Sequence, residues 1–132
     1  MKWKLIGAFT IPEIMPGLND YSAAERSNRH CGAKIKARWT AAAALYAKKI
    51  PKVERSLYPV KMLYRWYEPS RRRDLDNISA FGRKVIQDGL VQAGVLENDG
   101  WKQICGFVDE FFVDTEHPRI EVYIYTEDKH AE

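Results

Sequence analysis

A helical segment at residues 77–93, with a strand-like segment on each side of it, constrains the fold of this chain most. Apolar residues recur along it at helical spacing and form one hydrophobic face, which consists of Ile78, Phe81, Val85, Ile86, Leu90 and Ala93. Gly94 follows at the position where helices commonly end. Residues 58–67 and 101–113 have the side chains and flanking turn residues of strands. We therefore expect a helix that connects two strands.

The rest of the chain extends this pattern into a complete fold. Residues 2–9 and 119–126 predict two further strands, the second with regular alternation along its length. Residues 20–50 are helical in character up to Pro51, and the pattern leaves open whether 20–30 joins that helix or forms a turn of its own. The order strand, helix, strand, helix, strand, strand predicts an α+β fold with a mixed sheet and helices packed on it. A length of 132 residues is typical of a single domain.

Charge is unevenly distributed along the sequence. The formal net charge is only +3, but residues 1–84 contain 18 Lys and Arg against 7 Asp and Glu. Residues 85–132 contain 3 against 11, so the last third of the chain is acidic. The positive excess over the first two thirds favours a basic surface suited to nucleic acid. A solvated charged surface, or an acid-to-base contact within a dimer, would give the same distribution.

The sequence disfavours a membrane or an oxidising environment. No apolar run approaches the ~20 residues of a membrane span, and the N-terminal apolar stretch is too short for a signal peptide. The two cysteines, Cys31 and Cys105, lack the spacing of a disulfide framework or a zinc site. We therefore expect a protein of the reducing cytoplasm that does not enter a membrane.

Three aspartates are the strongest candidates for a reactive site. Asp74 and Asp76 lie one residue apart, where their carboxylates repel each other unless a cation lies between them. Asp99 lies beyond the predicted helix, in an Asn-Asp-Gly turn. Taken singly, Asp76 or Asn77 would serve as a helix cap and Asp99 as an ordinary turn residue. If the strands on either side of the helix are neighbours, however, Asp74, Asp76 and Asp99 could converge on one site.

The three aspartates have the chemistry of a site for a hard divalent cation. Mg²⁺ prefers carboxylate and water oxygens, and it commonly bridges to a substrate phosphate. In phosphodiester cleavage such a metal would polarise the phosphoryl oxygen, help to generate hydroxide and stabilise the leaving oxygen. Other phosphate-handling enzymes also use neighbouring aspartates, so the acids alone do not define the reaction. The absence of a Gly-x-x-x-x-Gly-Lys loop argues against a nucleoside triphosphatase.

Basic side chains next to these acids could bind phosphate. The run Arg71-Arg72-Arg73 directly precedes Asp74, and arginine forms charge-assisted, often bidentate hydrogen bonds with phosphate. Lys84 lies four residues before Asp88, on the same side of the predicted helix. Lys84 is either half of an exposed ion pair that contributes ~0.3–0.5 kcal/mol, or a cation that stabilises charge in a transition state.

The same region resembles the RusA-type Holliday junction resolvases. The resemblance rests on four stretches: Arg71-Arg72-Arg73-Asp74-Leu75-Asp76-Asn77, Asp88-Gly89-Leu90, Ala93-Gly94-Val95 and Asn98-Asp99. It is strong over residues 71–105, moderate in the layout of the terminal strands and weak over 10–60. It implies a single RusA-like endonuclease domain with a Mg²⁺ site, and Mn²⁺ as an alternative metal.

The resemblance implies a role for each matched acid and arginine. The metal ligands and catalytic carboxylates would be Asp74, Asp76 and Asp99. The second acidic cluster of the family is often Asp-Asp, whereas this chain has Asn98 at the first position, so only Asp99 is carried over. The basic residues expected to contact DNA are Arg71, Arg72, Arg73 and Arg83.

The catalytic lysine of the family does not occupy its usual position in this chain. In the family it follows the second aspartate of the motif by four residues, where this chain has Ala80. The helix is about one turn longer than in the best-known members, and counting back from Asp88 gives the role to Lys84. Arg83 is the second choice for the same role.

The resemblance, together with these residues, implies a Mg²⁺-dependent, structure-selective endodeoxyribonuclease that resolves four-way DNA junctions by paired symmetric nicks in recombination and repair. The resemblance also implies a phage or prophage setting and a homodimer, since symmetric incision requires two active sites. Two other hypotheses fit the residues: a non-catalytic DNA-binding protein, and a metal-dependent phosphohydrolase of small molecules. The positive balance of residues 1–84 disfavours the phosphohydrolase, because a small anion needs few cations.

Overall fold

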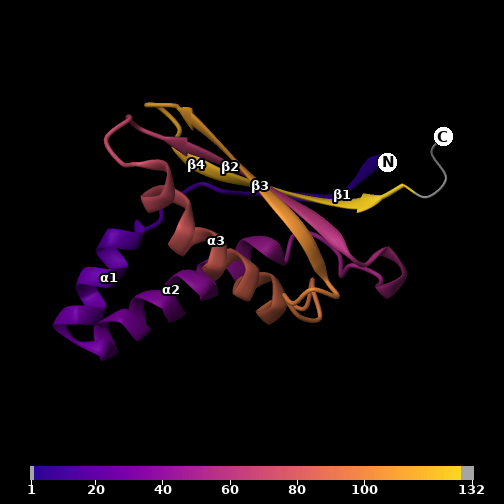
Figure 1. The fold of residues 1–132 in the computed structure, drawn as a ribbon, viewed down its shortest axis with the longest axis horizontal. Helices are drawn as coiled ribbons and strands as arrows, with labels where there is room; N and C mark the ends of the chain where they lie inside the picture. The colour runs from indigo at the N-terminus through magenta and orange to yellow at the C-terminus, as the bar shows by residue number, and fades with distance from the viewer. Residues whose placement is uncertain (1, 129–132) are drawn as a thin grey trace.

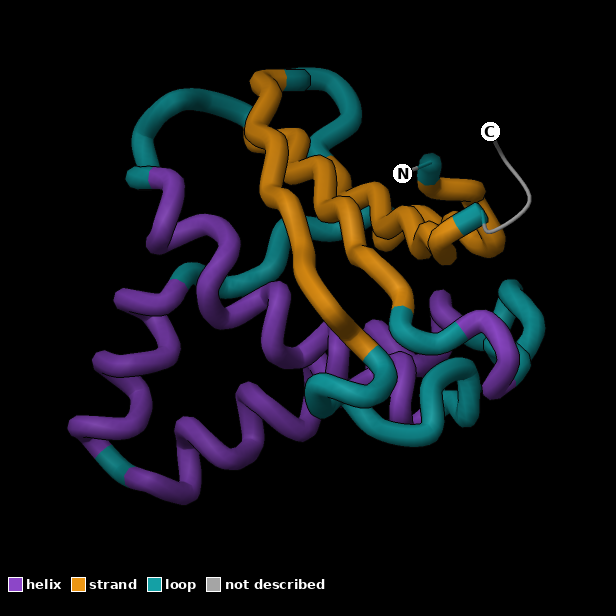
Figure 2. The backbone as a smooth tube through the Cα atoms, turned by 45° about the vertical axis from the view of Figure 1, so that its right-hand side comes forward, coloured by secondary structure: helices purple, strands orange, loops and turns teal. Residues whose placement is uncertain are grey.

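The computed structural model describes residues 2–128, which form one four-stranded sheet with helices on one side of it (Figures 1 and 2). The strands are β1 (Trp3–Ile11), β2 (Val60–Glu68), β3 (Ile104–Val113) and β4 (Arg119–Glu127). Their order is β1-β4-β2-β3, in which β4 is antiparallel to β1 and β2 while β3 is parallel to β2. The sheet is therefore mixed, and the α+β prediction is confirmed.

Three helices and one short 3₁₀ turn connect the strands. They are α1 (Leu18–Ser27), α2 (Arg29–Ala47), α3 (Leu75–Gln92) and the 3₁₀ turn at Arg55–Leu57. The first predicted helical region is thus two helices, separated at Asn28. The backbone of Asn28 is extended, and its side chain accepts a hydrogen bond from the His30 amide at 2.8 Å, so it caps the start of α2. Within residues 2–128, no helix has both the length and the apolar character needed to cross a membrane.

β2 supplies the middle of the core because every second side chain of this strand is buried. The buried residues of the strand are Val60, Met62, Tyr64, Trp66 and Glu68, as the period of two in a strand requires.

Glycines let α3 approach its neighbours closely. A Cβ atom at Gly82 would lie 2.8 Å from the Trp66 ring, and one at Gly89 would lie 2.7 Å from the Ala43 Cβ of α2.

α3 connects the neighbouring parallel strands β2 and β3, and it fixes where the candidate residues lie (Figure 1). The helix begins at Leu75, two residues before the predicted start, with Asp74 as its N-cap. Shortly after its end, Gly94 takes a positive φ of 78°, which glycine adopts without strain. A helix of 18 residues is about 27 Å long, so its two ends are well separated.

Candidate functional site

The N-terminal end of α3 carries two acids whose side chains form no ion pair with another described residue. The Asp74 side chain makes no capping hydrogen bond, and only its carbonyl accepts from the Ile78 amide at 3.0 Å. Asp76 lies in the first turn. Both side chains are exposed, and neither forms a hydrogen bond or an ion pair within residues 2–128. The positive end of the helix macrodipole favours negative charge at this position, but it does not supply a counter-ion.

Two residues of the same motif are structural. Arg73 forms a bidentate ion pair with the buried Glu68, with Nε to Oε1 at 2.8 Å and Nη2 to Oε2 at 2.9 Å. Its Nη1 donates to the Met15 carbonyl at 3.2 Å. Asn77 accepts a hydrogen bond from the Asn19 amide at 2.8 Å and so holds the start of α1. Because each guanidinium nitrogen of Arg73 donates to the protein, we assign Arg73 to the fold rather than to the predicted DNA contact.

Arg71 and Arg72 differ from Arg73, because both are exposed and neither has an ion pair among the described residues. Arg71 and Asp74 border a cavity of about 370 Å³ between the end of β3 and the start of α3. The apolar wall of the cavity consists of Leu75, Ile78, Phe111, Phe112 and Val113. Unpaired arginines, an unpaired aspartate and an open cavity thus adjoin one another at this end of the helix.

The middle of α3 carries a cluster in which two acids and a lysine neutralise one another. Lys84 Nζ donates to Asp88 Oδ1 at 2.9 Å and to Asp99 Oδ2 at 3.0 Å. The hydrogen bonds to Asp88 and Asp99 raise the pKa of Lys84, and the hydrogen bond from Lys84 lowers the pKa of the Asp99 carboxyl. Lys84 is therefore an ammonium at neutral pH, which suits it to stabilise negative charge rather than to accept a proton.

Arg83, the second choice for the lysine's role, has a different partner. Its guanidinium forms an ion pair with Asp109 of β3 and lies over the Phe107 ring, 4.3 Å from the ring centroid. Asp109 also accepts a hydrogen bond from the Trp66 indole at 3.0 Å. These contacts hold Arg83 against the sheet, so Lys84 and not Arg83 adjoins Asp99. The predicted DNA contact of Arg83 therefore gains no support from its surroundings.

The two acidic regions do not meet within one chain. Among residues 2–128, no three side chains of His, Cys, Asp or Glu lie close enough to hold a metal ion. Asp76 and Lys84 are separated by about 12 Å along the helix axis, and Asp99 is bonded to Lys84. The predicted convergence of Asp74, Asp76 and Asp99 is thus absent from the single chain, because α3 separates them. A cage of these three carboxylates does not fit one copy of the protein.

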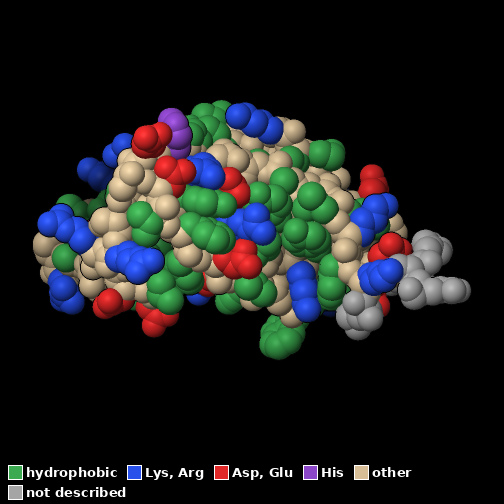
Figure 3. Space-filling view, turned by 90° about the horizontal axis from the view of Figure 1, so that it is seen from above, with side chains coloured by type: hydrophobic (Ala, Val, Ile, Leu, Met, Phe, Trp, Pro, Cys, Tyr) green, Lys and Arg blue, Asp and Glu red, His purple; other side chains and the backbone are tan. Residues whose placement is uncertain are grey.

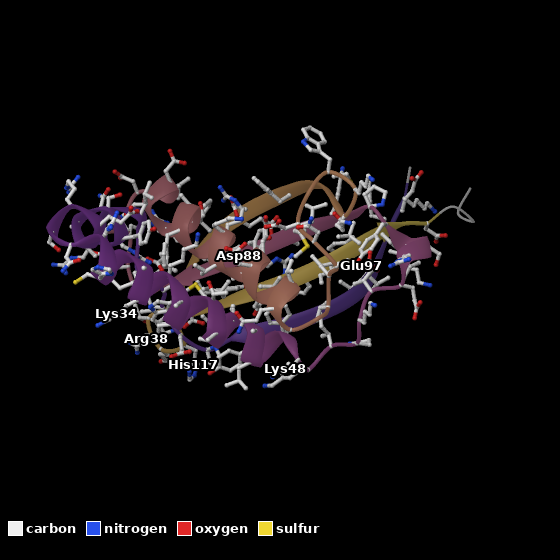
Figure 4. The ribbon with its side chains drawn as sticks, turned by 90° about the horizontal axis from the view of Figure 1, so that it is seen from below. Lys34, Arg38, Lys48, Asp88, Glu97 and His117 are labelled. Carbon is white, nitrogen blue, oxygen red and sulfur yellow. The ribbon has the colours of Figure 1, made fainter. Side chains whose placement is uncertain are left out.

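Much of the positive charge lies along α2. The basic residues on and directly after this helix are Arg29, Lys34, Lys36, Arg38, Lys48 and Lys49, and within residues 2–128 none of them forms an ion pair. Figure 4 shows Lys34, Arg38 and Lys48 along the outer side of α2. The open face of the sheet differs: on it, basic and acidic side chains lie among one another (Figure 3). Its arginines are paired with acids, and Arg65, for example, forms an ion pair with Glu110 at 2.8 Å. The helical side therefore offers the better surface for a phosphate backbone.

Comparison with known families finds a match over most of the chain. A family model described as endodeoxyribonuclease RusA matches residues 19–125, which is most of the chain. The match includes α3 and the acidic residues at both of its ends. A comparison with curated proteins finds no match. The chain therefore belongs to the RusA family of endodeoxyribonucleases, which resolve Holliday junctions.

Proposed function

We propose that the chain is a Mg²⁺-dependent, structure-selective endodeoxyribonuclease that resolves four-way junctions by paired symmetric nicks, with Mn²⁺ as an alternative metal. The observation that carries this proposal is the pair of exposed, uncompensated carboxylates of Asp74 and Asp76 next to the unpaired Arg71 and Arg72. Carboxylates this close need a cation, and hard divalent cations take carboxylate ligands. Membership of the family supplies the reaction class.

The basic residues would hold the DNA backbone. Arg71 and Arg72 lie next to Asp74 with free guanidinium groups, which suit charge-assisted hydrogen bonds to the phosphates on either side of the scissile bond. The basic residues along α2 extend this contact to a DNA arm through charge that does not depend on base sequence (Figure 4). Backbone contacts of this kind fix the position of a junction and leave its shape to decide where cleavage occurs.

Lys84 has the proposed role of the family's lysine. Its hydrogen bonds to Asp88 and Asp99 hold the ammonium on one side of α3, and its raised pKa keeps it protonated. A fixed positive charge beside the reacting phosphate would stabilise the negative charge that its oxygens gain during cleavage. Asp99 is in this arrangement both a proposed metal ligand and the residue that orients Lys84.

We also infer a homodimer that acts in recombination and repair, in a phage or prophage setting and in the cytoplasm. Resolution of a junction requires incision of two strands at symmetric positions, and two copies related by a two-fold axis supply two equivalent sites. Cys31 and Cys105 are free and exposed, which suits a reducing compartment.

Asp74→Asn tests the proposed site because it removes one charge with little change of shape. We expect cleavage of a synthetic four-way junction in Mg²⁺ to fall at least ~100-fold, while the variant still binds the junction. Glu116→Gln alters an exposed acid in the turn before β4 and should cleave at the wild-type rate. Unchanged cleavage by the Asp74→Asn variant would refute the site.

The wild-type protein separates the other two hypotheses in the same assay. Junction binding without cleavage in either Mg²⁺ or Mn²⁺ would favour a non-catalytic DNA-binding protein. Hydrolysis of a small phosphate ester, with no junction binding at low salt, would favour a phosphohydrolase of small molecules.

A further inference from the structure

We propose that the outer part of the α1–α2 hairpin, residues 22–38, holds the backbone of one duplex of the junction at a fixed distance from the cleavage site. We call these residues the helical projection. This inference rests on the proposed function, because it assigns the place at which one part of that substrate is bound. It adds a requirement that the proposed function does not contain, which is a minimum length for that duplex.

The helical projection contributes little to the hydrophobic core. α1 has no buried residue, and Gly32 is the only buried residue between positions 22 and 38. The other buried residues of α2 are Ala43, Ala44 and Ala47, near its C-terminal end. Figures 1 and 2 show the turn between the two helices at the outer end of the helical layer, away from the sheet. Two helices that bury so little surface in the fold leave their outer ends available to a partner.

The helical projection nevertheless has a fixed shape and direction. Its two helices approach closely near the turn, since a Cβ atom at Gly32 would lie 2.5 Å from the Cγ atom of Glu25. At its base, the Asn19 amide donates to Oδ1 of Asn77 at 2.8 Å, in the first turn of α3. This hydrogen bond ties the start of α1 to the motif that carries the acids. The distance from the acids to the turn is therefore set by the length of α1.

The charge of the helical projection suits a polyanion. Residues 22–38 contain five basic residues and one acid, Glu25. Within residues 2–128 none of the five forms an ion pair, and they are Arg26, Arg29, Lys34, Lys36 and Arg38. Figure 3 shows Lys and Arg side chains gathered at the end of the molecule where this turn lies. Such charges bind DNA through its phosphates and do not depend on base sequence.

A second copy of the chain would be the alternative partner, since residues 85–132 contain 11 acids. Most of these acids, however, are already neutralised within their own chain. Seven of them form ion pairs: Asp88, Glu97, Asp99, Asp109, Glu110, Asp114 and Glu121. The phosphate backbone carries an unpaired negative charge on every nucleotide. DNA is therefore the better match for five unpaired cations.

The length of α1 determines where the duplex is held. A helix of 10 residues is about 15 Å long, and α1 starts beside Asn77. The turn of the helical projection therefore lies about 15 Å from the start of α3. Because each base pair of a duplex adds about 3.4 Å, the contact falls about 4–5 base pairs from a phosphate bound at Asp74 and Asp76. A shorter duplex would not reach the helical projection.

Arg29→Ala with Lys34→Ala tests the contact through the salt dependence of junction binding, measured in chelator so that no cleavage occurs. The slope of log affinity against log salt should fall by about 1.8, or about 0.9 for each phosphate no longer neutralised. Both side chains are exposed, so the circular dichroism spectrum should not change. Lys4→Ala with Lys52→Ala removes the same charge from two exposed lysines outside the helical projection. A reduction no larger than that of this control pair would overturn the proposal.

Cys31 gives a readout of position that does not depend on cleavage. It is exposed and is the third residue of α2, next to the turn. In a Cys105→Ser variant it is the only cysteine of the chain. A junction carrying a short mixed-disulfide tether on one duplex should cross-link at least ~5-fold more with the tether about 5 base pairs from the branch point than at about 15 base pairs. Equal yields at the two positions would overturn the proposal.

The outcomes separate this inference from the proposed function. Junction cleavage by the wild type, with an unaltered salt slope in the Arg29→Ala, Lys34→Ala variant, would support the function and overturn the contact. The predicted salt and cross-linking results without cleavage in Mg²⁺ or Mn²⁺ would refute the function and support the contact. Loss of dimerisation in this variant, with unchanged DNA binding, would assign the helical projection to a second copy and overturn the proposal. A wild type that binds no junction at low salt would overturn both.

Discussion

The two acidic regions of α3 carry similar side chains in opposite electrostatic states. At the N-terminal end, the side chains of Asp74 and Asp76 form no ion pair within residues 2–128. In the middle of the helix, Lys84 is bonded to Asp88 at 2.9 Å and to Asp99 at 3.0 Å. Charges without a partner are available for a ligand, whereas paired charges hold a fixed geometry. We therefore propose that the N-terminal end receives a cation and a phosphate, whereas the contacts of the Lys84 cluster are already formed.

The largest expected effect is a loss of stability when Arg73 is replaced, because Arg73, unlike Arg71 and Arg72, forms an ion pair. Arg73→Ala leaves the buried carboxylate of Glu68 without its ion-pair partner, and such a loss costs ~3–5 kcal/mol of stability. Urea denaturation measures this change. Arg71→Ala removes an exposed arginine without an ion pair and should change stability by less than ~0.5 kcal/mol. Equal losses in the two variants would show that the run of arginines is not divided into structural and free members.

The next largest effect is a lower rate of junction cleavage when Lys84, in the middle of α3, is replaced. Lys84→Ala removes a fixed positive charge, so single-turnover cleavage of a junction should slow by ~100-fold or more. Metal binding should persist, because the carboxylates remain. Lys52→Ala, an exposed lysine after α2, is the matched control and should leave the rate unchanged. Full activity of the Lys84→Ala variant would transfer the role to Arg83 or remove it from the mechanism.

A smaller effect concerns the salt dependence of DNA binding. Arg71→Ala with Arg72→Ala should reduce the slope of log affinity against log salt by about 0.9 for each phosphate that the variant no longer neutralises. The free arginines at the N-terminal end of α3 are the reason for this expectation. Arg65→Ala, whose guanidinium is already paired with Glu110 on the sheet, should leave the slope unaltered. The opposite ranking would place the DNA on the open sheet face.

The smallest effect is the pH dependence of stability from the Lys84–Asp99 pair. The pKa of Asp99 is lowered in the folded state, so its contribution is present above the unfolded pKa of about 3.9 and is lost as pH falls through the folded value. The pKa of Lys84 is raised, so its contribution is present below about 10.4 and is lost as pH rises through the folded value. Solvent screening limits the pair to about 0.5 kcal/mol.

Urea midpoints at pH 7 and pH 3 measure the acid side of this dependence. Asp99→Asn should lose less stability between the two pH values than the wild type does, because one acid that favours the folded state is gone. An identical loss in wild type and variant would show that the ion pair does not contribute in solution.

Periodicity predicts the regular elements well, because burial of one face is decided by local spacing. The alternation in β4 and the apolar face of α3 place both elements within two residues of their observed ends. The break between α1 and α2 lies at Asn28, whose side chain caps the start of α2. Because a single capping side chain marks this break, the spacing of apolar residues does not locate it. The order of the strands depends on long-range pairing, which the sequence pattern does not specify.

The pairing of charges could be predicted only in part. Spacing places Lys84 beside Asp88 on one helix face, and this contact is present. The sequence of three consecutive arginines does not show which of them forms a structural ion pair. Arg73 pairs with Glu68 because the loop before α3 folds back on β2, and this contact is visible only in the folded chain. The expected meeting of Asp76 with Asp99 follows from neighbouring strands, but the length of α3 prevents it within one chain.

The nuclease assignment depends on one comparison of substrates. A synthetic four-way junction and a duplex of matched sequence are each incubated with the wild-type protein in Mg²⁺, in Mn²⁺ and in excess chelator. We predict paired nicks at symmetric positions in the junction, no cleavage of the duplex, and no cleavage of either substrate in chelator. Cleavage that continues in chelator, or a junction that is bound but intact in both metals, would contradict the assignment of Asp74 and Asp76 to a metal-dependent nuclease site.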